Sequence, residues 1–247
     1  TEQIDFEIRS FITVDENTTQ EIIHCKGQAS YQTVPNVSKI NRTMLEAKMN
    51  KGTLAKAELY PMFAASGLTY GEAHQGIEKI HIGENEVLAN LCLPEILESD
   101  EHTSVFTLHP SMMDSAFQAT IGLLADINNS SEKPSLPFLV ESLKIHKKCT
   151  EEMVAWIRKS PTAVGNNNTT KVDIDLCDTE GNICVQIQGF ISRTLNTQTQ
   201  NTNYVVATTT SKTNQQNGLS FNEAYHKNLI KSYLNNEVSL DDILELV

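Results

Sequence analysis

The sequence LHPSMMDSAFQATIGLLADI, residues 108–127, carries the strongest helix signal in the chain. Pro110 suits the first helical position, because the N–H that proline lacks would have no helical partner there. Beyond it, small and apolar residues recur at spacings of three and four, as on one face of a helix: Met113, Ala116, Phe117, Thr120 and Leu124. We predict a single helix over residues 110–127 that is apolar enough to be buried.

Segments on both sides of this helix alternate apolar and polar residues, a pattern typical of strands. Upstream we expect two hairpins, formed by residues 6–12 with 21–24 and by residues 75–82 with 86–93. Downstream we expect four strands, over residues 137–145, 153–158, 171–178 and 182–193. One long buried helix among antiparallel strands predicts the α+β class, with a curved sheet wrapped round the helix.

The remaining regions are more polar. Residues 32–52 contain Pro35 and are expected to be a connection, followed by a second helix over residues 54–65 that ends at Gly67. Residues 196–217 are mostly Thr, Asn, Gln and Ser, too polar to offset the entropy of ordering, so we predict a flexible linker. Residues 218–247 contain two Ser-x-x-Glu/Asp helix starts, and we expect a short helical docking segment, because such short helices are marginal alone.

Composition narrows the possible partners. The 247 residues suffice for one large domain or two small ones, and the formal net charge of -12 argues against broad binding to nucleic acid or anionic lipid. No apolar run approaches the roughly 18 residues of a membrane helix, and no signal region opens the chain, so we expect a cytoplasmic protein. The first residue is Thr, which indicates a processed or excised piece. Five cysteines without a close pair are expected to be reduced and structural.

Asp114 and Gln118 are the first candidates for chemistry. They lie four residues apart and therefore share one face of the predicted helix. Apolar surroundings push a carboxyl towards its neutral form, which a general acid needs near neutral pH. The alternative, which spacing alone favours, is that Asp114 only stabilises the helix N-terminus electrostatically.

The pattern His-Pro-x-x-x-Asp-x-x-x-Gln over residues 109–118 also resembles the Asp motif of polyketide synthase dehydratase domains. Residues 67–77, GLTYGEAHQGI, resemble the GLxYGPxFQGI segment of that family. The resemblance covers about residues 5–195 and implies a hot-dog fold that is part of a double hot-dog. Residues 1–33 would be the final strands of a first hot-dog subdomain, and residues 34–195 the second subdomain.

The resemblance also implies a reaction. Dehydratases of this family remove water from a β-hydroxyacyl thioester on the phosphopantetheine arm of an acyl carrier protein, with no other cofactor. A His of the first half takes the α-proton, and the Asp of the second half protonates the leaving hydroxyl. On this chain Asp114 would be the acid and Gln118 would orient it. Substrate-binding positions would be Tyr70, Gly71, His74, His109 and Pro110.

The chain departs from the family pattern at two places. Glu72 and His74 stand where the family usually has Pro and Phe. The HxxxGxxxxP motif that supplies the catalytic His occurs nowhere in the sequence. We expect that His in a preceding segment and expect these residues alone to be inactive. The chain's own histidines, His74 included, are expected to be structural or solvated, and no metal-ligand spacing joins them.

A basic cluster offers a candidate docking surface for an acidic carrier protein, although such clusters are often only solvated turns. Its predicted docking residues are Lys147, Lys148, Arg158 and Lys159.

Two other functions stay open: a double-bond-shifting isomerase of the same fold, and a non-catalytic module that positions carrier proteins or neighbouring synthase domains. Isomerases of this fold tend to lose the Asp, so Asp114 favours dehydration. The protein could also form a homodimer, and the sequence does not decide this. The tail, residues 229–247, faintly resembles interdomain docking helices of bacterial modular synthases.

Overall fold

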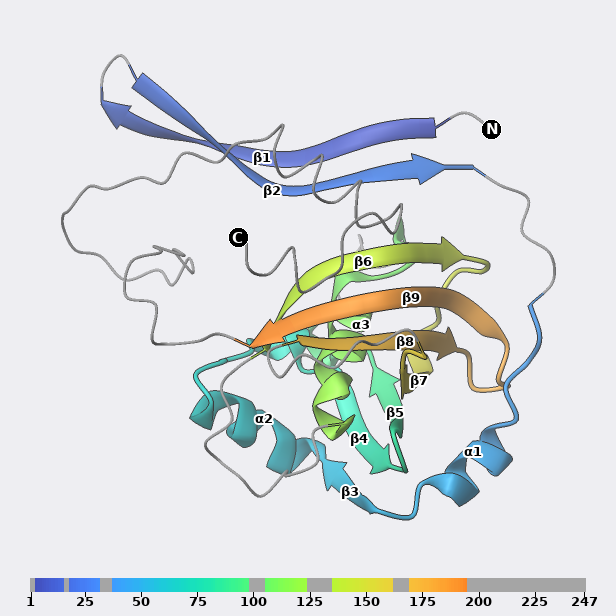
Figure 1. Ribbon diagram of the computed structural model, residues 1–247. Helices are drawn as coiled ribbons and strands as arrows, with labels where there is room; N and C mark the ends of the chain where they lie inside the picture. The colour runs from blue at the N-terminus through green and yellow to red at the C-terminus, as the bar shows by residue number, and fades with distance from the viewer. Residues whose placement is uncertain are drawn as a thin grey trace. The chain divides into compact units, whose positions relative to one another are not determined.

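The computed structural model describes residues 3–15, 18–31, 37–97, 105–123, 135–161 and 169–194. They belong to two compact units, Thr1–Val37 and Ser38–Val247, which we describe separately. The predicted linker and docking segment, residues 196–217 and 218–247, lie outside the described residues. Figure 1 shows the strands and helices of both units.

The first unit is a hairpin, as predicted, with strands longer than the alternating pattern indicated. Strands β1 (Gln3–Asp15) and β2 (Thr18–Ser30) pair antiparallel along their whole length. Gly27 faces Phe6, whose ring lies where a Cβ would stand, 2.5 Å from Cζ. The ring therefore covers the glycine. Several large apolar side chains of β1 are exposed: Ile4, Phe6, Ile8, Phe11 and Ile12.

The second unit is built on one antiparallel sheet of seven strands, ordered β3-β4-β5-β7-β8-β9-β6. The strands are β3 (Gly52–Ala55), β4 (Ile77–Ile82), β5 (Glu86–Cys92), β6 (Ser135–Ile145), β7 (Glu152–Lys159), β8 (Thr169–Cys177) and β9 (Ile183–Thr194). The six strands predicted in this unit are confirmed to within about two residues. Strand β3 is not among the predictions, because a helix is expected from residue 54. Strand β6 precedes β7 in the chain yet pairs with β9 at the sheet edge.

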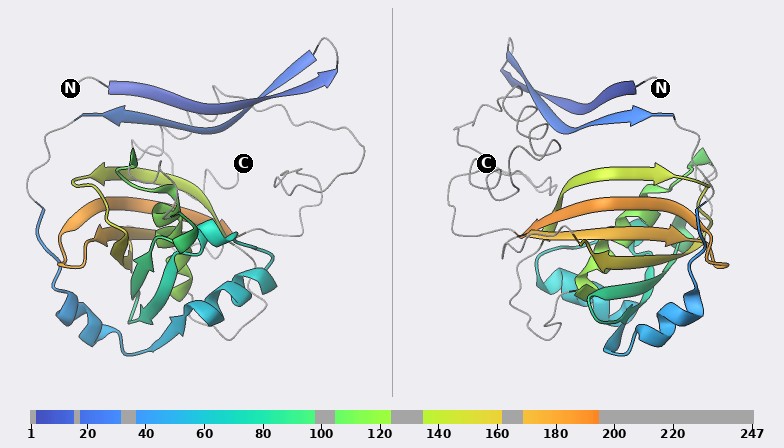
Figure 2. Two further views of the ribbon diagram at one scale, coloured as in Figure 1. Left: turned by 180° about the vertical axis from the view of Figure 1, so that it is seen from behind. Right: turned by 45° about the vertical axis from the view of Figure 1, so that its right-hand side comes forward.

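Helix α3 (Pro110–Gln118) lies inside the curve of this sheet (Figures 1 and 2). Met112 and Ala116 are buried among core residues of β4, β5, β7, β8 and β9. The ring of Phe117 stacks on Phe190 of β9, with centroids 4.2 Å apart. The α+β prediction of a sheet wrapped round a buried helix is confirmed.

The prediction that one helix continues to residue 127 was wrong. The α-helix ends at Gln118, and a 3-10 helix, η4 (Ala119–Leu123), continues the chain. Thr120 contributes to this change, because its hydroxyl donates to the carbonyl of Phe117 at 2.7 Å and competes with helical hydrogen bonding. Gly122 lets η4 approach the sheet, since a Cβ there would stand 2.9 Å from Ile80 and 3.0 Å from Val87. Residues 124–127 lie outside the described residues.

Two further helices flank the sheet. Helix α1 (Arg42–Lys48) forms where a connection was predicted, because the Asn41 side chain accepts the N–H of Met44 at 3.0 Å and caps the first turn. It buries Leu45 against Leu88 and Val154. Helix α2 (Lys56–Ala65) begins after β3, with the Glu58 carboxylate accepting the N–H of Ala55. Short 3-10 helices, η1 (Glu72–His74) and η2 (Glu95–Leu97), precede β4 and follow β5.

No helix in the described ranges is long and apolar enough to cross a membrane. All five cysteines are free. Within the same ranges, no group of three or more His, Cys, Asp or Glu side chains is placed to hold a metal ion.

Candidate active site

The first turn of α3 positions Asp114. His109 is the N-cap of the helix, and its Nδ1 accepts the N–H of Ser111 at 3.1 Å. Pro110 follows at the first helical position, as its sequence predicted. Asp114 lies one turn further on, with its side chain 32 % exposed. His109 and Pro110 therefore set the start of the helix that carries the carboxyl.

Two side chains contact the same carboxyl oxygen of Asp114. Gln118 donates from Nε2 to Oδ2 at 2.8 Å, and Nδ1 of His74 lies 3.1 Å from the same oxygen. Gln118 is buried, at 5 % exposure, whereas the His74 side chain is 47 % exposed. No described residue makes a hydrogen bond to Oδ1. Among the described residues, therefore, only one of the two carboxyl oxygens has a hydrogen-bond partner.

The turn η1 brings His74 to this carboxyl across a long sequence separation. Its N–H donates to the carbonyl of Gly71 at 2.8 Å, and its own carbonyl accepts Nε2 of Gln118 at 2.9 Å. Gly76 lets the chain leave η1 close to α3, because a Cβ there would stand 2.5 Å from Oγ of Ser115 and 2.8 Å from the carbonyl of Cys92. Close passage at Gly76 fixes the position of His74.

Tyr60 of α2 also belongs to this network, and sequence reasoning missed it. Its hydroxyl lies 3.2 Å from Oε1 of Gln118 and accepts the N–H of Ile77 at 3.0 Å. The available signal was a tyrosine on the buried side of a helix, where the hydroxyl needs a partner. Burial raises the pKa of Tyr60, and the Asp114 carboxylate adds to the shift, so the phenol keeps its proton.

Tyr70 packs beside Tyr60. Its ring lies edge-on to Phe63, with centroids 5.0 Å apart, and burial raises its pKa to about 12. Its carbonyl accepts Nε2 of Gln75 at 2.8 Å. The next residue, Gly71, has no described atom within 4 Å of the place where a Cβ would stand. Packing within the described residues therefore leaves open space beside Gly71.

The four predicted docking residues do not form one cluster. The N–H of Lys147 donates to the carbonyl of Cys184 at the start of β9. Lys159 ends β7, an eight-residue strand whose length is roughly 25 Å. Between them in sequence, Arg158 contacts Asp175 at 2.8 Å and stacks on the ring of Trp156. Arg158 is therefore engaged within the sheet, and Lys147 and Lys148 are separated from Lys159.

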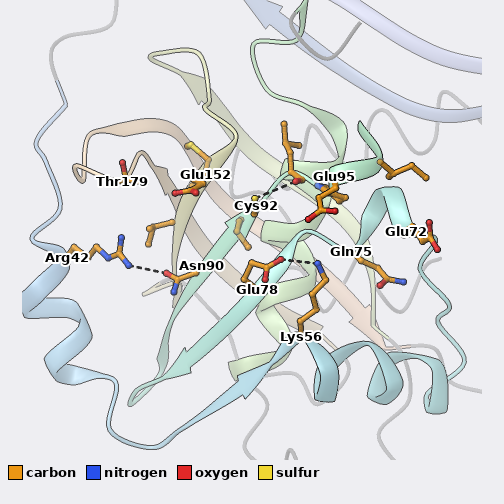
Figure 3. A pocket seen from close by; sticks show the side chains of 16 residues that line it. Arg42, Lys56, Glu72, Gln75, Glu78, Asn90, Cys92, Glu95, Glu152 and Thr179 are labelled. Carbon is orange, nitrogen blue, oxygen red and sulfur yellow. Dashed lines mark hydrogen bonds and ion pairs between the residues drawn. The ribbon is translucent and has the colours of Figure 1, made fainter. Parts of the chain in front are cut away.

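An open groove of about 970 Å³ is lined by residues that do not include Asp114, although Glu72 and Gln75, which flank His74, are among them (Figure 3). Glu72, Glu78, Glu95 and Glu152 contribute carboxylates to its wall. Lys56 pairs with Glu78 at 2.9 Å. The charged residues of its lining are therefore these four carboxylates and two cations, Lys56 and Arg42.

Comparisons with known proteins identify the family of this chain. Residues 44–202 match the family model described as polyketide synthase dehydratase N-terminal domain. The polyketide synthase PksM of Bacillus subtilis (strain 168) is 37% identical over 176 residues, which are 70% of this chain and 4% of PksM.

Solved structures match the fold. A trans-AT PKS dehydratase domain from Brevibacillus brevis superposes with a TM-score of 0.71 at 34% identity, covering 78% of this chain and 66% of that domain. The dehydratase domain from the CurF module of the curacin polyketide synthase gives a TM-score of 0.66 at 23% identity, covering 78% and 64%. This chain therefore spans about two thirds of these domains and a small part of the curated synthase, and its fold is the predicted hot-dog. The chain belongs to the polyketide synthase dehydratase family.

Proposed function

We propose that this chain supplies the general acid of a dehydratase domain in a cytoplasmic, multidomain polyketide synthase. The domain would eliminate water from a β-hydroxyacyl thioester on an acyl carrier protein and leave an α,β-unsaturated thioester. The observation that carries the proposal is the Asp114 carboxyl, whose Oδ2 is held by Gln118 and His74 while Oδ1 has no described partner. Retention of this Asp favours dehydration over the isomerase alternative.

The proposed chemistry follows from those contacts. Protonated Asp114 gives the proton on Oδ1 to the β-hydroxyl, the Cβ–O bond breaks, and water leaves. A base removes the α-proton, and the electrons of that C–H bond form the Cα=Cβ double bond. Gln118 donates to Oδ2 throughout, and this hydrogen bond stabilises the carboxylate that the proton transfer creates. This elimination needs only an acid and a base, so the phosphopantetheine arm that carries the substrate is the only cofactor that the reaction needs.

The base is expected outside these residues, in the first half that the family resemblance implies. His74 lies at the acid, with Nδ1 directed to Asp114 Oδ2. We therefore assign His74 to the hydrogen-bond network of the acid and not to the role of the base. The isolated 247 residues should therefore show no useful dehydration, because losing a general base costs about 10² to 10⁴-fold in rate.

Asp114→Asn in the complete dehydratase domain tests the acid. The amide has the shape of the carboxyl but no acidic proton, so elimination should fall by about 10² to 10⁴-fold while the thermal unfolding temperature stays near that of the wild type. Gln118→Ala should be milder, because it removes orientation and leaves the proton. Small and equal effects from both changes would contradict the assignment of Asp114 as the acid.

A further inference from the structure

The Tyr60 hydroxyl joins three elements: α2, which carries it, the start of β4 and the end of α3. Its ring packs near Phe63 and Tyr70, at centroid distances of 6.1 and 6.2 Å. Neither ring contact requires the hydroxyl. The hydroxyl instead makes two hydrogen bonds, one with the N–H of Ile77 and one with Oε1 of Gln118.

Two backbone groups of fixed polarity stand at the ends of this network. The N–H of Ile77 can only donate, and it donates to the Tyr60 oxygen at 3.0 Å. The phenol has one proton, which this bond does not use. The neighbouring acceptor, Oε1 of Gln118 at 3.2 Å, therefore receives it. At the other end the carbonyl of His74 can only accept, and the Gln118 amide lies 2.9 Å from it.

These two ends allow one orientation of the Gln118 amide. Oε1 faces the Tyr60 proton, and Nε2 divides its two hydrogens between the His74 carbonyl and Oδ2 of Asp114. The flipped amide would place its oxygen against two acceptors, the His74 carbonyl and Oδ2 of Asp114, and would leave the phenol proton without its acceptor. Such a buried mismatch of donors and acceptors is unfavourable, because each unmatched group has left water without gaining a partner.

The orientation of Gln118 decides which oxygen of Asp114 carries the proton. Oδ2 accepts the Gln118 N–H, so a neutral carboxyl is best protonated on Oδ1. In the proposed reaction Oδ1 is the oxygen that faces the substrate. A flipped amide would instead attract the acid proton to Oδ2 and hold it there.

We propose that Tyr60 is a positioning residue of this dehydratase: its phenol fixes the polarity of the Gln118 amide and thereby keeps the transferable proton of Asp114 on Oδ1. The inference rests on the proposed function of Asp114. It adds a residue 54 positions earlier in the sequence, on a different helix, that acts only through Gln118.

A double-mutant cycle in the complete dehydratase domain tests this role, with Tyr60→Phe, Gln118→Ala and the combination of both. Tyr60→Phe keeps the ring contacts and removes the phenol proton, so kcat should fall on the order of tenfold with little change in KM. In the Gln118→Ala background the same change should have almost no further effect on kcat, because the amide through which Tyr60 acts is gone. Tyr31→Phe is the matched control, since Tyr31 is 90% exposed on the hairpin unit, and its kcat should stay unchanged.

Equal losses from Tyr60→Phe in both backgrounds would overturn the proposal, as would an unchanged kcat in Tyr60→Phe alone. If Tyr60→Phe does not fold, Gln118→Glu tests the same polarity, because a carboxylate there places acceptors against Asp114 and the His74 carbonyl. Its kcat should fall at least as far as that of Gln118→Ala, and wild-type activity would overturn the proposal. Asp114→Asn in the same assay reports separately on the acid: if that variant stays active the proposed function fails, whatever the cycle shows.

Discussion

At the scale of single residues, the site is a set of hydrogen bonds whose members come from distant parts of the chain. Asp114 and Gln118 could be paired from sequence, because a spacing of four places both on one helical face. His74 and Tyr60 could not be assigned to the same network, since they reach α3 from η1 and α2. No local pattern encodes contacts across 40 and 58 residues.

Tyr70 gives a prediction about stability. Burial raises its pKa from 10.0 to about 12, and the Asp114 carboxylate adds to the shift. Above pH 10 the unfolded chain therefore loses the Tyr70 proton while the folded chain still holds it, so stability falls as pH rises towards about 12. Tyr70→Phe has no phenol to ionise, and its free energy of unfolding should fall less over this window. Urea unfolding at both ends of the window measures the difference, and parallel declines in the two proteins would contradict it.

At the scale of elements, the strands were predictable and the short helices were not. Alternation with a period of two is visible within six to twelve residues, which is why β4 to β9 were found nearly to their ends. Helix α1 has seven residues and buries only Leu45, too few apolar positions for a helical period. The end of α3 was misjudged because the apolar spacing runs on through η4, where Gly122 and Thr120 change the backbone.

The approach of η4 to the sheet depends on Gly122. A methyl group there would meet Ile80 and Val87, both fully buried and stiff at χ1. Gly122→Ala should therefore destabilise the domain by about 1–3 kcal/mol, as overpacking does. Gly71→Ala is the matched control, because no described atom lies within 4 Å of its Cβ position. Thermal unfolding of the two variants measures this difference in stability. Equal unfolding temperatures would contradict the prediction, because they would show that η4 can move away from the sheet without loss of stability.

At the scale of the whole molecule, this chain matches only part of the proteins that it resembles. It spans about two thirds of the solved dehydratase domains that it matches. We propose that the acid lies within it and that the base and the carrier-bound substrate come from outside. This division stays a prediction from sequence motifs, because the Asp motif is present and the HxxxGxxxxP motif is not.

Carrier docking is the prediction that belongs to this scale. Arg158 is engaged with Asp175 and Lys159 lies at the end of β7, so we take Lys147 and Lys148, which are adjacent in sequence, as the docking candidates to test. The net charge of -12 repels an acidic carrier, and a local positive site would act over a Debye length of about 10 Å at 0.1 M salt. Lys147→Glu with Lys148→Glu should slow the reaction of carrier-bound substrate, more so at low salt, and leave a small thioester analogue unaffected. Equal slowing of both substrates would mean that these lysines are structural.

The central claim is that Asp114 gives a proton to the leaving group, and the identity of that leaving group tests it most directly. Hydroxide leaves only with a proton, whereas chloride needs none. The measurement compares kcat/KM for a β-hydroxyacyl and a β-chloroacyl thioester in the complete domain, wild type against Asp114→Asn. The substitution should lower elimination from the hydroxy substrate by about 10² to 10⁴-fold and from the chloro substrate by less than about tenfold. Equal losses for the two substrates would contradict the assignment of Asp114 as the general acid.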